Sequence, residues 1–395
     1  MNAKKVFFTL ALATLTISLT GAGEWSGYGA LELKGFEESP AFNGQENSVG
    51  IASVFEPQYY QDWKDGYRAF EFSPYFRWDS LDSERNLVDV RELSYLYVED
   101  NWELKIGVSK VFWGVAESQH LVDVVNQTDL VANPDGEDKL GQPMVQYSLI
   151  TNLGDFSLFV LPWFRERTFA GEEGRSRSAL PVDLDNATYE SSAEESHVDF
   201  ALRWFHIIGN FDIGLHYFRG TRRDPIFSVS EDGSKLFPHY EQMDQIGLDL
   251  QYTQGGLLLK LEALGRETES EDFSAAVGGF EYTLYGIANS AMDAGLLVEA
   301  HLDSRGAGAP NPFNRDVFVG SRLTWNDSAD SSLVAGVFYD WDLGSLSTRV
   351  EFEKRIGNSL KLEVELQRFS DIDEKDPLIS FSRDSYLQVT LSRYF

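Results

Sequence analysis

From residue 24 onward, the chain alternates between apolar and polar residues in segments of about ten residues. In residues 358–368, aliphatic side chains alternate with charged or amide side chains: Leu360, Lys361, Leu362, Glu363, Val364, Glu365, Leu366 and Gln367. Successive side chains of a β-strand point to opposite faces, so each segment is expected to be a strand with one apolar and one polar face. The sequence therefore predicts an all-β chain.

Alternation alone does not distinguish a soluble β-sandwich from a membrane-spanning barrel. The segment length favours the barrel, because transmembrane β-strands need about 9 to 11 residues. Aromatic placement favours it too, since Trp or Tyr recurs near the segment ends, where the apolar band of a barrel meets water. These residues are Trp25, Tyr59, Trp78, Trp102, Trp204, Tyr252, Trp325, Trp341 and Tyr394.

The connections alternate between short turns and long polar segments, as in outer-membrane barrels. Short turns are expected at residues 64–65, 100–101, 152–153, 209–210, 254–255, 289–292, 327–331 and 357–358. Long connections are expected at residues 37–47, 79–88, 111–141, 163–196, 220–242, 266–272, 303–315 and 370–382. Residues 342–345 are the one exception, a short connection where the alternation calls for a long one. We predict a transmembrane, antiparallel, up-and-down β-barrel of about 18 strands, with about 16 as the alternative count.

Residues 1–23 have the features of a secretory signal peptide. Lys4 and Lys5 precede an apolar stretch at residues 6–19, and small residues follow at positions 20–23. The stretch is shorter than the roughly 20 residues that a membrane-spanning helix needs, which counts against an anchor helix. We expect residues 1–23 to be cleaved and residues 24–395 to form the barrel as one domain.

Charge and cysteine content exclude several functions. The formal net charge of −30 would repel a nucleic-acid backbone, so no nucleic-acid partner is expected. The absence of cysteine excludes disulfides, a thiol nucleophile and a cysteine-ligated metal. No metal-binding or phosphate-binding motif is present, so we expect no metal and no cofactor. His216 and His301 fall on inward strand faces without a serine partner in a recognisable motif, and we do not expect an enzyme.

The chain ends in Phe395, and apolar residues precede it at every second position: Leu387, Val389 and Leu391. This ending resembles the carboxy-terminal signal of bacterial outer-membrane barrel proteins, although Arg393 departs from the usual apolar step. The resemblance implies a place in the bacterial outer membrane, contact with its lipid and lipopolysaccharide, and recognition of the Phe395 end by the barrel assembly machinery. The last strand is expected to close the barrel against residues 24–34.

If the aliphatic faces contact lipid, the polar faces line the interior, where charges need water or partners. Near the carboxyl terminus, the expected lumen wall carries Glu351, Glu353, Lys361, Glu363 and Glu365. Lys260 and Arg322 are further inward-facing bases, but acids outnumber bases. This excess predicts a preference for cations. The alternative is that the charges pair across strands and only support the barrel.

The connection at residues 111–141 has an apolar pattern, which is unexpected in a solvent-exposed tip. Leu121, Val124 and Val125 have helical spacing. We expect the segment to fold into the barrel and narrow it, as the constriction loop of porins does. The alternative is a helix that caps the pore from outside. The candidate constriction residues are Trp113, Glu117, His120, Asp123, Asn126 and Asp129.

The turn at residues 112–114 and the His, Asp and Asn residues after it resemble segments of uncharacterised proteobacterial porin-like proteins, a resemblance that implies no particular substrate. Arginines in later connections form a candidate basic cluster opposite the constriction, which would create a transverse field or grip a carboxylate or phosphate solute. The alternative is exposed charge at the rim. These residues are Arg165, Arg167, Arg219, Arg222 and Arg223.

Together, these patterns predict a porin-like outer-membrane channel for passive diffusion of small hydrophilic solutes. The alternative is a non-conducting structural or export-associated barrel whose lumen is closed by loops. The sequence leaves the solute and the oligomeric state open.

Overall fold

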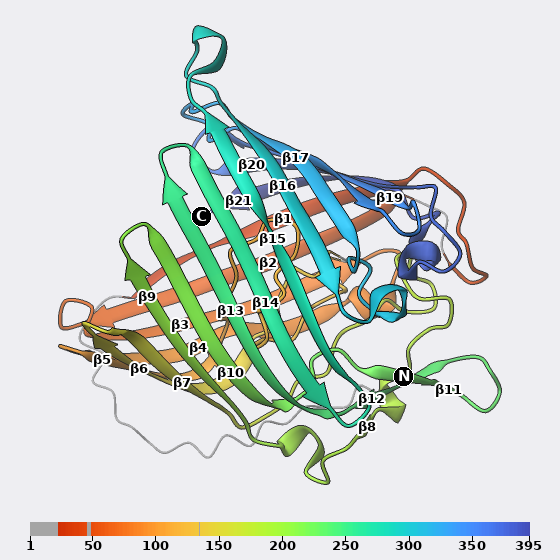
Figure 1. Ribbon diagram of the computed structural model, residues 1–395, viewed down its shortest axis with the longest axis horizontal. Helices are drawn as coiled ribbons and strands as arrows, with labels where there is room; N and C mark the ends of the chain where they lie inside the picture. The colour runs from red at the N-terminus through yellow and green to blue at the C-terminus, as the bar shows by residue number, and fades with distance from the viewer. Residues whose placement is uncertain (1–22, 46–48, 134) are drawn as a thin grey trace.

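The computed structural model describes residues 23–45, 49–133 and 135–395. Within them, 18 strands form one closed antiparallel sheet, which Figure 1 shows as a barrel of tilted strands. The barrel strands are β1 (Glu24–Phe36), β2 (Gly50–Trp63), β3 (Arg68–Asp79), β4 (Leu87–Glu99), β5 (Trp102–Ser109), β6 (Gln142–Thr151), β7 (Gly154–Leu161), β9 (Asp199–Ile208), β10 (Phe211–Thr221), β13 (Gln242–Gln254), β14 (Leu257–Thr268), β15 (Asp272–Leu284), β16 (Asp293–Asp303), β17 (Asp316–Thr324), β18 (Ser332–Asp340), β19 (Leu346–Ile356), β20 (Leu360–Ser370) and β21 (Tyr386–Tyr394).

A smaller sheet and short helices lie in the connections. The smaller sheet contains β8 (Thr188–Tyr189), β11 (Ile226–Val229) and β12 (Leu236–Tyr240). The 3-10 helices are η1 (Ser83–Arg85), η2 (Leu184–Asn186), η3 (Glu194–Ser196), η4 (Ile287–Asn289), η5 (Gly306–Gly308) and η6 (Pro377–Phe381). No helix in the described part of the chain is long and apolar enough to cross a membrane.

The barrel closes through β1 and β21, which pair antiparallel from Tyr28 opposite Tyr394 to Phe36 opposite Tyr386. Each remaining barrel strand pairs with the barrel strands before and after it along the chain. Closure satisfies the backbone N–H and C=O groups that an open sheet edge would leave unpaired in lipid. The predicted up-and-down barrel, its closing strand pair and the count of 18 are confirmed.

Alternate strand positions face opposite sides of the barrel wall, as the sequence pattern predicts. Leu202 and Ile246 are 52% and 63% exposed on the outer surface, whereas Asp199 and His301 are buried inside at 1%. The rings of Trp25 and Tyr59 lie 5.1 Å apart at one end of the barrel. Tyr394 does not lie on the outer surface, as the predicted aromatic belt requires. It lies an even number of residues from Tyr386 in β21, and therefore on the same, lumen-facing side. The outer surface is therefore apolar and the interior polar.

The short turns lie where the sequence predicts them, but two long connections differ from expectation. The connection predicted at residues 266–272 is wrong, because β14 continues to Thr268 and only residues 269–271 join it to β15. Arg266 is therefore a wall residue. The connection predicted at residues 220–242 is present at residues 222–241, and it also contains the β11–β12 hairpin, which the sequence did not predict. The short turns and the long connections occupy opposite ends of the barrel, called here the short-turn end and the long-loop end.

Long connections from different parts of the chain are tied together over the long-loop end. Arg175 donates from Nε to Asp384 Oδ1 at 2.7 Å, and Gln45 donates from Nε2 to the Gly174 carbonyl at 3.0 Å. These contacts join residues 37–45, 162–198 and 371–385 into one layer above the lumen. The predicted signal peptide, residues 1–23, lies outside the described residues except for Gly23.

Candidate functional site

Residues 111–141, called here the inner loop, lie inside the barrel. Figure 1 shows this segment as an orange-to-yellow coil among the strands. Val122 and Val125 are fully buried and pack in one apolar cluster with Phe159 and Phe218 of the wall. The predicted inward fold is confirmed, and the alternative of a capping helix outside the pore is wrong. The described residues of the inner loop contain no helix, so the helical spacing of Leu121, Val124 and Val125 is misleading.

Two buried carboxylates of the barrel wall hold the backbone of the inner loop. Glu262 of β14 accepts hydrogen bonds from the backbone N–H groups of residues 115, 116 and 122. Glu299 of β16 accepts from the backbone N–H groups of residues 117 and 118 and from the Ser118 hydroxyl. Both glutamates are at most 1% exposed. In a helix, these N–H groups would bond to carbonyls of the same segment. Here the wall carboxylates accept from them, so the inner loop can keep an irregular backbone.

Side-chain donors hold the rest of the loop. Arg223 donates from Nε and Nη2 to the carbonyls of Val124 and Val125, both at 3.1 Å. Asn126 donates to the carbonyls of residues 109 and 140 at 2.9 Å. Arg91 of β4 bonds the Lys139 carbonyl and the carboxylate of Asp129. Because buried backbone groups on both sides of the loop have partners, the loop is fixed in one position.

Four of the six predicted constriction residues support the inner loop. Trp113, 3% exposed, packs between Phe159 and His216, with ring centroids 5.6 and 5.0 Å away. Asn126 and Asp129 are buried at 1% and 0%, and the Asp123 side chain is buried beside Lys139. Trp113 and Asp129 are therefore corrected from pore lining to loop support, whereas Asp123 and Asn126 support the loop and also line a cavity inside the barrel. The reason is that Trp113 packs in an apolar cluster, while the three polar side chains contact backbone and basic groups around them.

Glu117 and His120 remain partly accessible, as expected of constriction residues. Glu117 Oε2 lies 2.5 Å from Arg322 Nη2 and 3.7 Å from Lys260 Nζ. Arg322 and Lys260 also approach the carboxylate of Glu281, at 3.3 and 3.7 Å. The bases that face the constriction are thus the inward-facing bases of β14 and β17, not the arginines in the later connections. The alternation of apolar and polar residues predicts that both bases line the inner wall, but nothing in the sequence indicates that they contact Glu117.

The predicted basic cluster does not form a single bank opposite the constriction. Arg219 lies on the outer surface beside Asp244, with its side chain 71% exposed, because it alternates with the inward-facing Phe218. Arg165 pairs with Asp89 at 2.9 Å. Four of its five members, Arg165, Arg219, Arg222 and Arg223, are instead paired with carboxylates.

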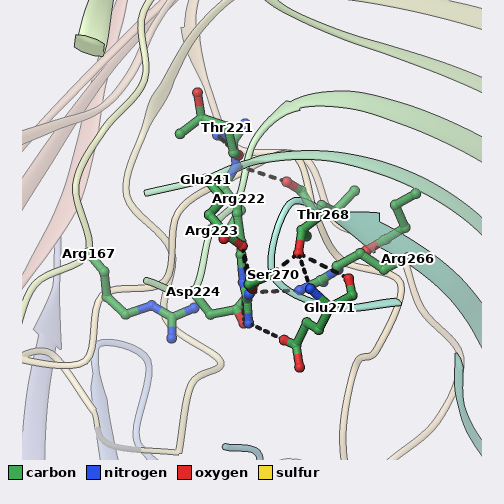
Figure 2. A network of polar contacts seen from close by, with 12 residues as sticks. Arg167, Thr221, Arg222, Arg223, Asp224, Glu241, Arg266, Thr268, Ser270 and Glu271 are labelled. Atoms are coloured by element: carbon green, nitrogen blue, oxygen red, sulfur yellow. Dashed lines mark hydrogen bonds and ion pairs between the residues drawn. The ribbon is translucent and has the colours of Figure 1, made fainter. Parts of the chain in front are cut away.

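Arg222, Arg223 and Arg167 lie in a dense polar network at the long-loop end. Figure 2 shows Arg222 between Asp224 and Glu271, with ion-pair distances of 2.8 and 2.9 Å. Arg223 pairs with Asp199 at 3.0 Å. Arg167 points toward Asp224 in the same view without an ion-pair line.

The lumen wall near the carboxyl terminus has the predicted orientation. Lys361 Nζ bridges Glu353 and Glu363 at 2.8 and 2.9 Å. Glu351 contacts Arg349, and Glu365 accepts a hydrogen bond from Tyr386. Cross-strand pairing therefore exists, as the alternative for these charges predicts. Four carboxylates against Arg349, Arg355 and Lys361 still leave a small excess of negative charge on this face, 4 − 3 = 1.

His301 has a serine neighbour that sequence inspection did not find. Ser118 Oγ lies 2.8 Å from His301 Nε2, and the other ring nitrogen is 3.3 Å from Gln119 Oε1. The same hydroxyl also donates to Glu299. A hydroxyl held between two wall groups serves as a loop anchor. Both ring nitrogens of His301 contact uncharged side chains, unlike the imidazole of a Ser-His-Asp triad, which a carboxylate orients.

A cavity of about 500 Å³ separates the inner loop from the long connections, and we call it the vestibule. Its floor includes Ser118, Gln119 and His120, and its roof includes residues 310–313 and Leu378. In residues 23–45, 49–133 and 135–395, no group of three or more His, Asp or Glu side chains is placed to hold a metal ion.

The structure is distantly similar to solved porins. No protein-family model and no curated protein matches the sequence. A variant of Rhodopseudomonas blastica porin is 12% identical with a TM-score of 0.46, and a triple mutant of that porin is 13% identical with a TM-score of 0.45. Each match covers 95% of this chain and 100% of the other chain.

The chain is an 18-stranded antiparallel β-barrel. The strand pairing, closed by β1 and β21, shows this fold. The site of interest in this barrel is the inner loop with the vestibule above it.

Proposed function

We propose that this barrel is an outer-membrane, porin-like channel for passive diffusion of small hydrophilic solutes. The observation that carries the proposal is the inner loop, which the wall clamps across the lumen while charged side chains line the wall on both sides of it. Charged groups inside a barrel need water or partners, and a hydrated lumen supplies the water. No step in this function requires covalent chemistry.

The outer surface supports the membrane location. Its strands carry exposed aliphatic side chains, and lipid provides the apolar environment that these side chains otherwise lack. Phe395 lies on this surface, with its ring 6.1 Å from that of Phe55. We propose that lipid and lipopolysaccharide surround the barrel, with the long-loop end outside the cell, and that the assembly machinery recognises the Phe395 end.

Planar-bilayer recording tests the channel. Purified protein that shows heat-modifiable migration on gels is expected to give stepwise conductance in KCl. If folded barrels never conduct, the lumen is closed by its loops, and the structural or export-associated alternative holds.

We further propose that the permeation path prefers cations, because the inward-facing positions of β19 and β20 carry four carboxylates against the three bases Arg349, Arg355 and Lys361. The double variant Glu353→Gln/Glu363→Gln removes two acids and leaves Lys361 without its partners. We expect it to lose most of the cation preference, measured as reversal potential in a KCl gradient. Asp244→Asn, on the outer surface, is the control. An unchanged reversal potential in the double variant would show that these wall acids do not govern permeation.

The cation preference is also expected to weaken in acid. Burial within the barrel and the neighbouring carboxylate of Asp135 raise the pKa of Asp138 to about 6. A raised carboxyl pKa means that Asp138 is charged above pH 6 and neutral below it. We therefore expect part of the cation preference to disappear with a midpoint near pH 6. Asp138→Asn should remove this titration, and an identical pH profile in that variant would contradict the assignment.

A further inference from the structure

The vestibule has more aromatic surface than a path for fully hydrated solutes requires. Phe169 and Phe227 meet edge to face with ring centroids 5.6 Å apart, and Phe313 and Phe338 stack at 4.3 Å. Phe273 also lines the vestibule, and the guanidinium carbon of Arg305 lies 3.4 Å from the centroid of the Phe273 ring. Rings of this kind bind apolar groups that leave water.

The ionic groups of the vestibule are almost completely paired. Each acid that lines it lies within ion-pair distance of a lining base. These pairs are Asp123 with Lys139, Asp135 and Glu137 with Arg349, Asp224 with Arg266, and Asp303 with Arg305. Arg223 pairs with Asp199 of the wall. Arg167 is the base left over: within the described residues, no carboxylate lies within 4.0 Å of its guanidinium.

The guanidinium of Arg167 has donors to spare. Its Nε donates to Gln127 Oε1 at 3.4 Å, and its backbone N–H donates to the Tyr240 hydroxyl at 3.1 Å. Across residues 23–45, 49–133 and 135–395, neither Nη1 nor Nη2 of Arg167 donates a hydrogen bond. Figure 2 shows this side chain reaching toward Asp224, which already pairs with Arg222 and Arg266.

The surroundings of Arg167 favour one additional anion. Burial raises the pKa of Asp224, but the charges of Arg266, Arg222 and Arg167 outweigh burial and hold that pKa well below its usual range. Burial lowers the pKa of Arg167 itself, because its charge has lost water without gaining a paired carboxylate. A bound carboxylate would restore that missing partner. A dianion such as phosphate would suffer more from the nearby charge of Asp224.

We propose that the vestibule binds a small monoanionic carboxylate with an apolar or aromatic body. The carboxylate takes the free Nη1 and Nη2 donors of Arg167, since a guanidinium fork matches a carboxylate in two parallel hydrogen bonds. The apolar body lies against Phe169 and Phe227, which flank the same cavity. A volume of about 500 Å³ suits a ligand of this size.

This site goes beyond the proposed channel function and does not depend on conduction. The acidic excess that favours cations surrounds Glu351 and Glu363 on β19 and β20, whereas Arg167 lies in the connection between β7 and β9. The two preferences therefore act at different places in the barrel. Occupation of the vestibule would place a ligand directly above the constriction.

Calorimetric titration of the folded, detergent-solubilised barrel tests the site with three probes. 3-Phenylpropionate has both the charge and the ring, 3-phenylpropanol lacks the charge, and propionate lacks the ring. We expect 3-phenylpropionate to bind roughly ten-fold more tightly than either partial probe, the difference expected of a charge-assisted contact or of ring burial. Equal affinities for the three probes, or no binding of 3-phenylpropionate, would overturn the proposal.

Variants separate the contributions of charge and ring. Arg167→Gln should weaken 3-phenylpropionate roughly ten-fold and leave 3-phenylpropanol unchanged. Phe227→Leu should weaken both aromatic probes. Arg219→Gln, which removes an arginine from the outer surface, should change neither. Loss of binding to both aromatic probes in folded Arg167→Gln, or no loss at all, would overturn the role of Arg167.

Bilayer recording of the same preparations keeps this result apart from the channel proposal. A barrel that conducts but binds no probe overturns the ligand site alone. A barrel that binds 3-phenylpropionate but carries no current supports the site and overturns the channel.

Discussion

Replacing Glu262 and Glu299 together by alanine is expected to release the inner loop and turn one steady conductance level into a larger, fluctuating one. The two carboxylates accept five backbone N–H groups and one hydroxyl from the loop. Buried donors left without acceptors cost about 1 to 3 kcal/mol each, so the anchored position loses on the order of 5 kcal/mol or more. Single-channel recording in KCl measures the outcome.

Glu71→Ala is the matched control for this double variant. Glu71 is also a wall carboxylate, but its partner is Gln58 on the adjacent strand. The control should keep the conductance of the unmodified protein. If the double variant and the control conduct alike, the wall carboxylates do not set the position of the loop.

Arg223→Met is expected to destabilise the folded barrel by about 3 to 5 kcal/mol, because it removes the arginine from a buried carboxylate and breaks two hydrogen bonds to the inner loop. The carboxylate of Asp199 keeps the Thr221 N–H and His197 as contacts. Asp199 is 1% exposed and lies 3.0 Å from Arg223 Nη1, while Nε and Nη2 of the same arginine hold two carbonyls of the inner loop. Methionine retains most of the apolar stem but none of the donors. The change in the free energy of unfolding is measured by titration with urea, in which gel migration of unheated samples reports the folded fraction.

Arg219→Met supplies the comparison four residues earlier. Its ion pair with Asp244 is 3.9 Å long, and the two side chains are 71% and 42% exposed. Exposed pairs of this kind contribute about 0 to 1 kcal/mol. Equal destabilisation by the two substitutions would contradict the role assigned to Arg223.

The barrel could be predicted because its determinants repeat locally along the chain. Residues 360–367 show the apolar and polar faces within one strand, and the turns recur at regular intervals. The same alternation places Arg219 on the outer surface and its neighbour Phe218 inside the barrel. Arg219 could therefore have been excluded from the basic cluster by counting alternate positions along β10.

The inner loop could be predicted in position but not in detail. Its apolar residues indicated burial, and Glu117 faces bases as a constriction residue should. Its anchors could not be found, because Glu262 and Glu299 lie more than a hundred residues away in sequence from the backbone groups that they hold. The vestibule likewise depends on side chains from separate connections, such as Arg167 and Phe227, which only the closed barrel brings together.

Single-channel recording of the folded protein beside a variant lacking residues 117–138 tests the central claim most directly. The claim is that the inner loop narrows a water-filled path through the barrel. We predict stepwise conductance from the intact protein and a distinctly larger step from the deletion variant. Folded barrels of both kinds that carry no current would contradict the claim, and so would steps of equal size.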